Sequence, residues 1–228
     1  MKQMALDIGL SRPPSLENYF AGPNESALQH LRLWTGQGPR APVPTYLWGE
    51  EGCGKTHLLQ AVRLAFQAQG QAVGWLDPHS PVPPSFDPAW VAVLMDDVQH
   101  YSALQQQVAF NWFVNALTPA QGAPCWVLAA GRQPPADLAL RDDLRSRLGW
   151  GHVYHLQLLD DAARQSVLRE AARERGVVLG DEVIRYMLSR FSRDLSSLME
   201  LLDHLDQYAL QTQRAPTVAL LRSMLENE

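Results

Sequence analysis

Before residue 159, apolar residues occur in short unbroken runs separated by longer stretches of helical spacing. Unbroken runs of about four to eight apolar residues are typical of strands buried on both faces of a sheet. Apolar positions three and four residues apart are typical of amphipathic helices. The expected strands are residues 43–48, 72–76, 90–95, 125–129 and 152–156, and the clearest helices between them are 55–69 and 103–117.

Strands that alternate with helices of about 10 to 15 residues predict a parallel, doubly wound sheet that binds ligands at the carboxyl ends of its strands. We therefore expect an α/β domain with a five-stranded parallel sheet over residues 15–158. Residues 1–14 have no helical stripe and end in two prolines, so they are expected to form an extended tail.

From residue 159 onward the pattern is helical only, which predicts a small helical domain over residues 159–228. Asp160 and Asp181 are expected to cap helices, and Gly176 is expected to end one. The predicted helices are 162–175, 182–190, 194–211 and 217–225.

The first expected strand leads into residues 49–56, Gly-Glu-Glu-Gly-Cys-Gly-Lys-Thr, which match the pattern G-x-x-x-x-G-K-[ST]. Glycines in such a loop let backbone N–H groups face phosphate oxygens, the lysine neutralises charge, and the hydroxyl can bind Mg²⁺. A merely structural glycine-rich turn is the alternative, but the flanking strand and helix favour a phosphate loop. The candidate nucleotide-binding residues here are Gly49, Gly52, Cys53, Gly54, Lys55, Thr56 and His57.

Two neighbouring carboxylates, Asp96 and Asp97, end the third expected strand. At the carboxyl edge of the sheet, Asp96 is expected to complete a magnesium site with Thr56. Asp97 is expected to orient or deprotonate a water molecule. The alternative is a helix cap, and the phosphate loop favours the catalytic interpretation.

Arginines cluster in residues 141–148, beyond the fourth expected strand. A guanidinium there could reach a nucleotide bound by a neighbouring subunit, including another copy of this chain in a homo-oligomer, and stabilise phosphoryl transfer. The alternative is a solvated helix end whose arginines pair with Asp142 and Asp143.

Composition narrows the possible partners. The net charge of −5 argues against strong non-specific binding to nucleic acid. No apolar segment is long enough to span a bilayer or act as a signal peptide, so a cytoplasmic protein is expected. In the tail, Gln3 precedes alternating apolar side chains, a shape that suits docking into a groove on another protein, although an incidental tail is the alternative.

Four segments together resemble the AAA+ domain of the bacterial replication initiator DnaA, and more closely the Hda-like regulatory branch of that family. They are residues 20–24, 49–59, 93–99 and 145–148, and the likeness to the regulatory branch also includes 46–49 and 146–151. The resemblance covers nearly the whole chain. It implies an AAA+ fold with a helical lid, and adenine held partly by the segment that contains Phe20, Gly22 and Asn24.

The resemblance also implies two partners and a cofactor. The tail residues Gln3, Met4, Leu6 and Ile8 are similar to a motif that binds the DNA sliding clamp, the beta subunit of DNA polymerase III, and Arg147 matches the family's arginine finger. The implied function is binding of ADP or ATP with Mg²⁺ and stimulation of ATP hydrolysis on DnaA, which prevents re-initiation.

Two departures from the family pattern indicate that nucleotide is held more than consumed. The fourth strand ends in Ala129-Ala130-Gly131, where a polar residue commonly positions water, so intrinsic hydrolysis is expected to be slow. In the lid, Ser196 stands at the place of a phosphate-binding arginine, and Arg193 is the substitute candidate because residues three apart share a helix face.

Two further functional classes are considered. An initiator or loader ATPase that acts directly on DNA would carry a helix-turn-helix domain after its lid, and residues up to Glu228 leave no room for one. An adaptor that uses only the fold is disfavoured by the intact Lys55-Thr56 and Asp96-Asp97 pairs.

Overall fold

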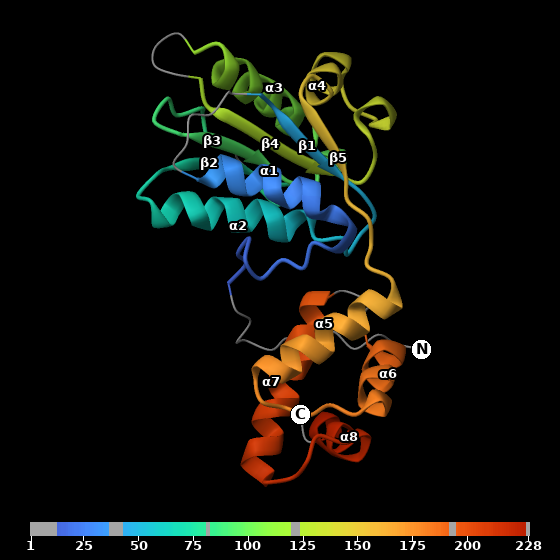
Figure 1. Ribbon diagram of the computed structural model, residues 1–228. Helices are drawn as coiled ribbons and strands as arrows, with labels where there is room; N and C mark the ends of the chain where they lie inside the picture. Colours follow the sequence, from blue (N-terminus) through green and yellow to red (C-terminus); the bar gives the residue numbers. More distant parts are fainter. Residues whose placement is uncertain (1–12, 37–42, 81–82, 120–123, 192–194, 227–228) are drawn as a thin grey trace. The chain divides into compact units, whose positions relative to one another are not determined.

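The computed structural model describes residues 13–36, 43–80, 83–119, 124–191 and 195–226 (Figure 1). Contacts between Cα atoms divide them into two compact units that meet at residues 158 and 159. The first unit contains the sheet and the second only helices, and each is described by itself below.

All five strands of the first unit run parallel, in the order β2-β3-β4-β1-β5. This confirms the predicted five-stranded parallel sheet. Parallel strands end at the same edge, so the loops after β1 and β3 lie on one side of the sheet. The strands are β1 (Thr45–Trp48), β2 (Val73–Leu76), β3 (Ala92–Met95), β4 (Trp126–Gly131) and β5 (His152–His155).

Helices cover both faces of the sheet (Figure 1). Helices α1 (Glu25–Thr35) and α2 (Lys55–Ala68) pack on one face, and α3 (Ala103–Leu117) and α4 (Asp142–Leu148) on the other. Successive strand residues serve opposite faces, as the strand period of two requires. Leu94 packs with α1 and α2, whereas its neighbours Val93 and Met95 pack with α3 and α4.

Strand β4 is longer than the sequence pattern predicted, since it ends at Gly131 instead of residue 129. Its pairing with β1 continues through Leu47 opposite Ala130 and Trp48 opposite Gly131. The extension carries the end of β4 to the phosphate loop, where the Gly49 N–H donates to the Gly131 carbonyl at 3.3 Å.

The second unit consists of α5 (Asp161–Glu174), α6 (Asp181–Arg190), α7 (Leu195–Thr212) and α8 (Val218–Glu226), which share one apolar core. The predicted cap at Asp160 is confirmed, because its carboxylate accepts from the Ala163 N–H at 2.7 Å. The predicted cap at Asp181 is wrong. Gly180 occupies the cap position of α6, and Asp181 lies in the first turn, where it pairs with Arg169 at 2.8 Å.

Arg175 anchors the carboxyl end of α5 to α7. Its Nε donates to Asp203 at 2.7 Å, its Nη1 donates to the Ala171 carbonyl, and the pair is mostly buried. The chain turns at Gly176, whose φ of +73° fits the predicted helix stop. No helix within the described ranges is long and apolar enough to cross a membrane.

Candidate nucleotide-binding site

The loop between β1 and α2 has the backbone geometry of a phosphate cradle. Gly52 and Gly54 have φ angles of +81° and +90°, which side chains other than glycine rarely adopt. Among the described residues, the backbone N–H groups of Gly52, Gly54 and Thr56 have no protein acceptor, while that of Lys55 faces the Cys53 sulfur. These donors therefore remain available for an anion at the start of α2.

Lys55 is the buried cation of this loop, with 7% of its surface exposed. Its ammonium donates to the carbonyl oxygens of Gly49 and Glu50 at 2.8 and 2.9 Å and lies 3.6 Å from the Cys53 Sγ. Carbonyl oxygens bind an ammonium less strongly than phosphate oxygens do, because they carry only partial charge. The side chain is therefore placed to exchange these contacts for a phosphate.

Asp96 leaves the end of β3 and is almost fully buried. Burial raises its pKa to about 6, and a hydrogen bond with the Thr56 side chain opposes this rise. The predicted magnesium ligands thus lie in contact. A hard dication prefers such oxygen ligands and would favour the charged carboxylate.

Asp97 is held in a left-handed backbone conformation, with φ 47° and ψ 46°. Its carboxylate accepts from the Gln99 Nε2 at 3.0 Å, while the Gln99 Oε1 accepts from the Arg132 N–H just after β4, also at 3.0 Å. Gln99 therefore links the proposed water-orienting carboxylate to the end of the neighbouring strand. The sequence interpretation missed this role.

Tyr19 is a second residue that sequence reasoning missed. Its hydroxyl donates to the Cys53 carbonyl at 3.1 Å, and a Cβ added at Gly54 would lie 2.6 Å from its ring. Burial raises the pKa of the Tyr19 hydroxyl to about 12, so it stays a donor. Phe20, the predicted neighbour, is 41% exposed.

Asn24 joins the segment before α1 to the residues after β5. Its Nδ2 donates to the Gln157 carbonyl at 2.9 Å and to the Tyr19 hydroxyl at 3.2 Å, and its Oδ1 accepts from the Gln157 N–H at 2.8 Å. The side-chain amide is thus fully used within the protein. Asn24 shapes the segment that also contains Gly22, which begins the 3-10 helix η1 (Gly22–Asn24).

Cys53 and His57 lie at the loop with mainly structural contacts. Burial raises the pKa of the Cys53 thiol, although Lys55 opposes the rise. The His57 Nε2 lies 3.1 Å from the Ser15 carbonyl, and its ring is tilted against Tyr19 at 5.7 Å between centroids. The segment from Ser15 to Asn24 therefore packs along the phosphate loop.

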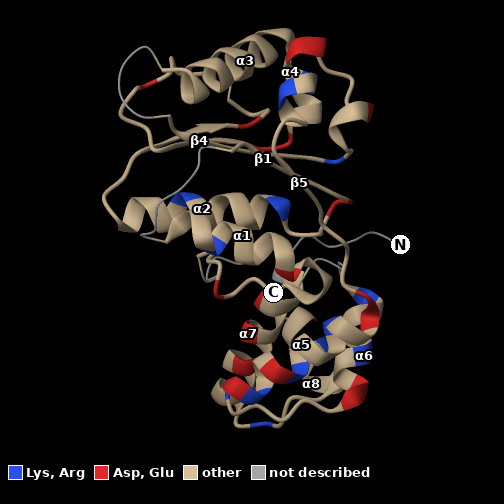
Figure 2. Ribbon diagram, turned by 45° about the horizontal axis from the view of Figure 1, so that its top comes forward, with Lys and Arg blue, Asp and Glu red and all other residues tan. Residues whose placement is uncertain are grey.

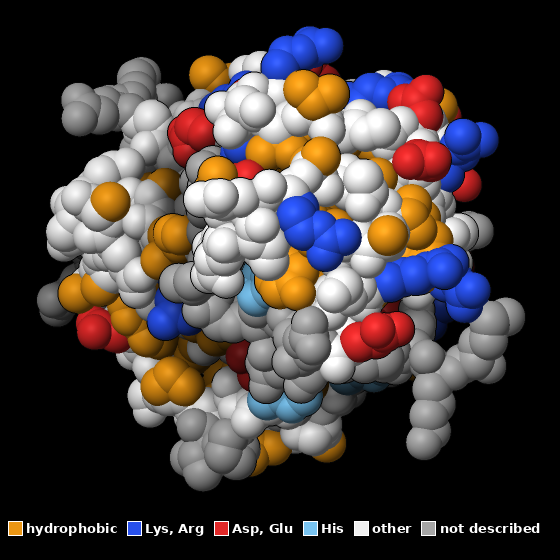
Figure 3. All heavy atoms as spheres, turned by 90° about the horizontal axis from the view of Figure 1, so that it is seen from below, with side chains coloured by type: hydrophobic (Ala, Val, Ile, Leu, Met, Phe, Trp, Pro, Cys, Tyr) orange, Lys and Arg blue, Asp and Glu red, His pale blue; other side chains and the backbone are white. Residues whose placement is uncertain are grey.

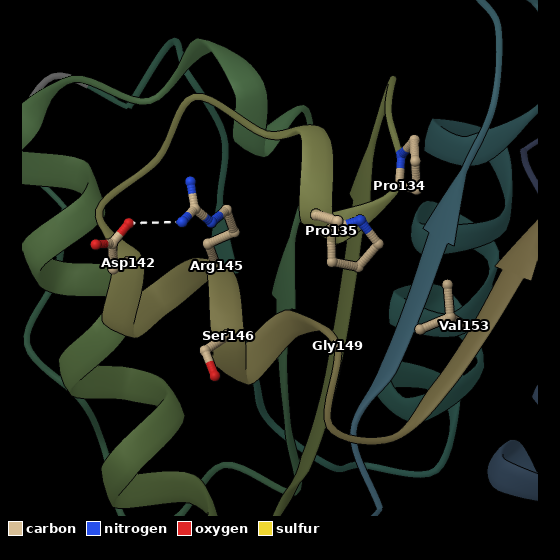
Figure 4. Close-up of a pocket in the computed structure, with 8 residues that line it drawn as sticks. Pro134, Pro135, Asp142, Arg145, Ser146, Gly149 and Val153 are labelled. Atoms are coloured by element: carbon tan, nitrogen blue, oxygen red, sulfur yellow. Dashed lines mark hydrogen bonds and ion pairs between the residues drawn. The ribbon is translucent and has the colours of Figure 1, made fainter.

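The three arginines of the predicted cluster lie in different surroundings. Arg141 pairs with Asp143 at 2.6 Å, and Arg145 pairs with Asp142 at 2.7 Å. Figure 2 shows that both charge signs occur on α4, and Figure 4 shows the Asp142–Arg145 pair beside an open hollow. That hollow is lined by Pro134, Pro135, Ala136, Asp142, Arg145, Ser146, Gly149 and Val153.

Arg147 differs from these neighbours. Its guanidinium carbon lies over the rings of Phe110 and Trp150, 4.9 and 4.6 Å from their centroids. Its Nε is buried without a hydrogen-bond partner, and no described carboxylate lies within 4 Å of its guanidinium. The paired helix end considered from the sequence thus fits Arg141 and Arg145 but not Arg147.

Five predicted site residues lie outside the described residues: Gln3, Met4, Leu6, Ile8 and Arg193. The others fall into two groups. The phosphate loop, Asp96, Asp97 and the segment from Phe20 to Asn24 come together at the carboxyl edge of the sheet, whereas Arg147 belongs to α4.

The first group fits a nucleotide with magnesium. Unpaired backbone donors and one buried ammonium suit phosphate oxygens, while the contact between a hydroxyl and a carboxylate suits Mg²⁺. Among the described residues, no cluster of three or more His, Cys, Asp or Glu side chains that could hold a different metal is found.

Comparison with known proteins identifies the family. An uncharacterized protein of Haemophilus influenzae is 31% identical over 234 residues, which cover 98% of each chain. The family model described as "Hda, lid domain" matches residues 161–225. The chain belongs to the Hda-like family.

Solved structures agree with this Hda-like assignment at the level of the fold. Domain III of the Thermotoga maritima replication initiation protein DnaA is 22% identical, with a TM-score of 0.70 over 96% of this chain and 98% of that one. AMPPCP-bound DnaA from Aquifex aeolicus is also 22% identical, with a TM-score of 0.69 over 87% of this chain and 66% of that one. The RuvB branch migration motor of T. maritima is 15% identical, with a TM-score of 0.65 over 94% and 72%. The Hda-like chain therefore has the AAA+ fold with a helical lid.

Proposed function

We propose that this chain is a nucleotide-holding regulator of replication initiation. It binds the DNA sliding clamp and stimulates hydrolysis of the ATP carried by the initiator DnaA, so that re-initiation is prevented. Membership of the Hda-like family supports the broader role of a DnaA-related replication regulator. The observation that carries the finer proposal is Arg147, whose guanidinium lies over two aromatic rings and has no carboxylate within 4 Å among the described residues.

The chain's own nucleotide is ADP or ATP, held with Mg²⁺ by the phosphate loop. Lys55 and the loop N–H groups bind the phosphates, and Thr56 and Asp96 bind the metal. The solved structure of DnaA with AMPPCP bound supports an adenine nucleotide as the ligand. Tyr19, Phe20 and Gly22 lie on the segment proposed to contact adenine, and Arg193 is the proposed lid residue that reaches the phosphates.

Intrinsic hydrolysis is proposed to be slow. Asp97 is the water-orienting carboxylate, and its oxygen already accepts from Gln99. The end of β4 offers only Ala129, Ala130 and Gly131, which have no side-chain donors. The Gln99 side-chain amide lies beside the end of β4, but its Nε2 already donates to Asp97 and its Oε1 already accepts from the Arg132 N–H. The chain therefore holds nucleotide more than it turns it over.

Arg147 acts on the partner's nucleotide. Hydrolysis transfers the γ-phosphoryl group to water and breaks its bond to the bridging oxygen of ADP, so charge builds on the phosphoryl and leaving oxygens. A guanidinium delivered by another subunit stabilises this charge and accelerates such reactions by about 10³- to 10⁵-fold. Within the described ranges, Arg147 has no ion pair closer than 4 Å, and Asp143 acts on it only at longer range, so its Nη groups can donate to phosphate oxygens.

The tail residues Gln3, Met4, Leu6 and Ile8 are proposed to bind the sliding clamp as an extended peptide. A pull-down with purified clamp tests this tether. Replacing Gln3 and Leu6 by alanine is expected to abolish retention of the chain, while Arg145→Ala should leave it unchanged. Undiminished retention of the tail variant would remove the clamp from the proposal.

Nucleotide binding is tested by thermal or urea unfolding with and without ADP or ATP and Mg²⁺. A nucleotide at a hundred times its dissociation constant adds about 2.7 kcal/mol to the free energy of unfolding. We expect Lys55→Ala to lose this gain and Arg63→Ala, on the same helix, to keep it. An equal gain in wild type and Lys55→Ala would contradict the assignment of the loop.

The finger is tested by measuring hydrolysis of DnaA-bound ATP in the presence of DNA-loaded clamp. Arg147→Ala is expected to abolish the stimulation while clamp and nucleotide binding persist. Arg145→Ala is the matched control, since that arginine lies on the same helix but already pairs with Asp142. Full stimulation by Arg147→Ala would overturn the proposed function.

A DNA-acting ATPase gains little support from the surface. The face in Figure 3 carries basic, acidic and hydrophobic side chains interspersed with one another. Counterion release requires a basic patch that tracks the phosphate backbone, and the net charge of −5 disfavours one.

A further inference from the structure

An exposed tryptophan beside the proposed finger carries a further inference. Trp150 exposes 60% of its surface, although it lies in the short turn between helix α4 and strand β5. Its indole is the ring nearest to the Arg147 guanidinium, at 4.6 Å. A cation over the face of a tryptophan gains about 0.5 to 1 kcal/mol at an exposed site, and more where water is excluded.

The backbone around Trp150 is fixed on both sides. Its N–H donates to the Arg147 carbonyl at 3.1 Å, which closes the end of α4. Two residues later, the His152 N–H donates to the Pro44 carbonyl at 2.9 Å. Between them, Gly151 passes so close to Pro44 that an added Cβ would lie 1.9 Å from the Pro44 oxygen. The indole therefore projects from an anchored turn.

The rings also replace the hydrogen bonds that usually hold an arginine. The Arg147 Nε is buried and unpaired among the described residues, so the direct contacts of the guanidinium are those with Phe110 and Trp150, while Asp143 attracts it at longer range. The indole itself is supported by Phe113, which meets it edge-on at 6.4 Å and 87°. The Phe110 ring also contacts Arg141, whose guanidinium carbon lies 5.0 Å from the ring centroid. Arg141 is held in turn by its ion pair with Asp143.

We propose that Trp150 is a positioning residue for Arg147: its ring face orients the guanidinium and leaves the Nη edge to donate to the phosphates of the partner's nucleotide. This inference rests on the proposed function, because it assigns Trp150 a role only if Arg147 acts on that nucleotide. The alternative is that Trp150 merely covers apolar surface at the end of α4.

Two substitutions separate these roles. Trp150→Phe keeps a ring face, whereas Trp150→Leu keeps apolar bulk without one. Stimulated hydrolysis of DnaA-bound ATP is measured at saturating concentrations of each variant with DNA-loaded clamp. We expect Trp150→Leu to lower the stimulated rate five- to tenfold and Trp150→Phe to stay within about twofold of wild type. Leu104→Ala truncates another side chain that is 60% exposed, and we expect it to leave the stimulated rate unchanged.

A second measurement reports the geometry without the partner. With the Arg147 guanidinium carbon 4.6 Å from the Trp150 ring centroid, we expect the ring current to displace the NMR signal of the Arg147 Nε–H. It should move toward the value of a free arginine in Trp150→Leu and much less in Trp150→Phe. Unchanged clamp binding and unfolding midpoints show that the variants are folded.

The outcomes distinguish the two proposals. If Arg147→Ala is inactive and Trp150→Leu is as active as wild type, Trp150 has no positioning role and the finger assignment stands. Equal losses in Trp150→Leu and Trp150→Phe would likewise overturn the role of the ring. Should Arg147→Ala stimulate fully, the proposed function fails, and the positioning role fails with it.

Discussion

The Tyr19 hydroxyl donates to the Cys53 carbonyl at 3.1 Å, a contact between residues 34 positions apart in the sequence. It fixes the segment before α1 against the phosphate loop. The same hydroxyl accepts from Asn24, which in turn binds Gln157. The conformation of the phosphate loop is therefore coupled to residues near the beginning and near the end of the α/β unit.

Tyr19→Phe is expected to weaken nucleotide binding about fivefold. One buried hydrogen bond to a loop carbonyl is worth about 1 kcal/mol, and its loss allows the loop to sample other conformations. Titration with a fluorescent ADP analogue measures the affinity. Tyr154→Phe, on the edge strand β5, serves as the control, and equal affinities for all three proteins would contradict the coupling.

Asp97 should tolerate asparagine better than alanine. Its φ of 47° disfavours alanine by about 1 kcal/mol, whereas asparagine adopts this conformation more readily and keeps an oxygen for Gln99. Urea unfolding is expected to show a loss of about 1 to 2 kcal/mol for Asp97→Ala and less than about 0.5 kcal/mol for Asp97→Asn. Identical losses would indicate that neither the backbone nor Gln99 matters there.

His30 gives the α/β unit a dependence on pH. Burial, together with nearby His152, lowers the pKa of His30 to about 4, while its Nε2 lies 2.8 Å from the Thr45 hydroxyl. The unfolded chain binds the proton with a pKa near 6.5, so the unfolded state holds more protons between pH 6.5 and 4. Stability from this group is therefore present above pH 6.5 and lost as the pH falls to 4.

This effect is measured as a difference between two proteins. From pH 7 to 4, wild type should lose about 1 to 2 kcal/mol more than His30→Gln, a figure reduced for solvent screening because His30 is partly exposed. The raised pKa of Asp96 acts in the opposite direction and cancels in the difference. Parallel pH profiles of the two proteins would rule out the titration of His30.

Gly151→Ala is expected to destabilise the protein by about 2 to 3 kcal/mol. The new Cβ would overlap the backbone of Pro44, which cannot move without disturbing the start of β1. Gly149→Ala is the matched control in the same turn, since its Cβ would meet only ordinary contacts at 3.5 and 3.7 Å. Thermal unfolding compares them, and equal midpoints would show that this turn yields easily.

The fold could be predicted because its determinants are local in sequence. Strands β3 and β4 are compact apolar runs, whereas β5 is a mostly exposed edge strand with a histidine at each end. The capping pair Ser102 and Gln105 marks the start of α3, whose limits match the predicted helix over residues 103–117. The error at Asp181 arose from the same local reasoning. An acidic residue suits both the cap and the first turn of a helix, and here Gly180 takes the cap.

The site was predicted only where a motif has fixed spacing. Lys55 and Thr56 belong to one continuous sequence motif. Asp96 follows the third predicted strand, and the alternation of strands with helices predicts a parallel sheet in which the loops after all strands lie at one edge. Gln99 reaches its partner Arg132, 33 residues away, because β3 and β4 are neighbours in the sheet. Tyr19 reaches its partner Cys53, 34 residues away, because the segment before α1 folds back onto the phosphate loop. No periodicity in a single sequence encodes such contacts, so these two residues required the structure.

The surroundings of Arg147 bear on the speed of recognition. An arginine held by a carboxylate must exchange one anion for another at every encounter, and the strength of that pair changes with salt. The rings of Phe110 and Trp150 contact the face of the Arg147 guanidinium and leave its N–H edge available to an anion. They also restrict the Arg147 side chain before a phosphate binds, which lowers the entropy cost of binding. If Arg147 acts on a nucleotide as proposed, we expect its association with that anion to depend on long-range attraction and collision geometry, without the prior exchange of an ion pair.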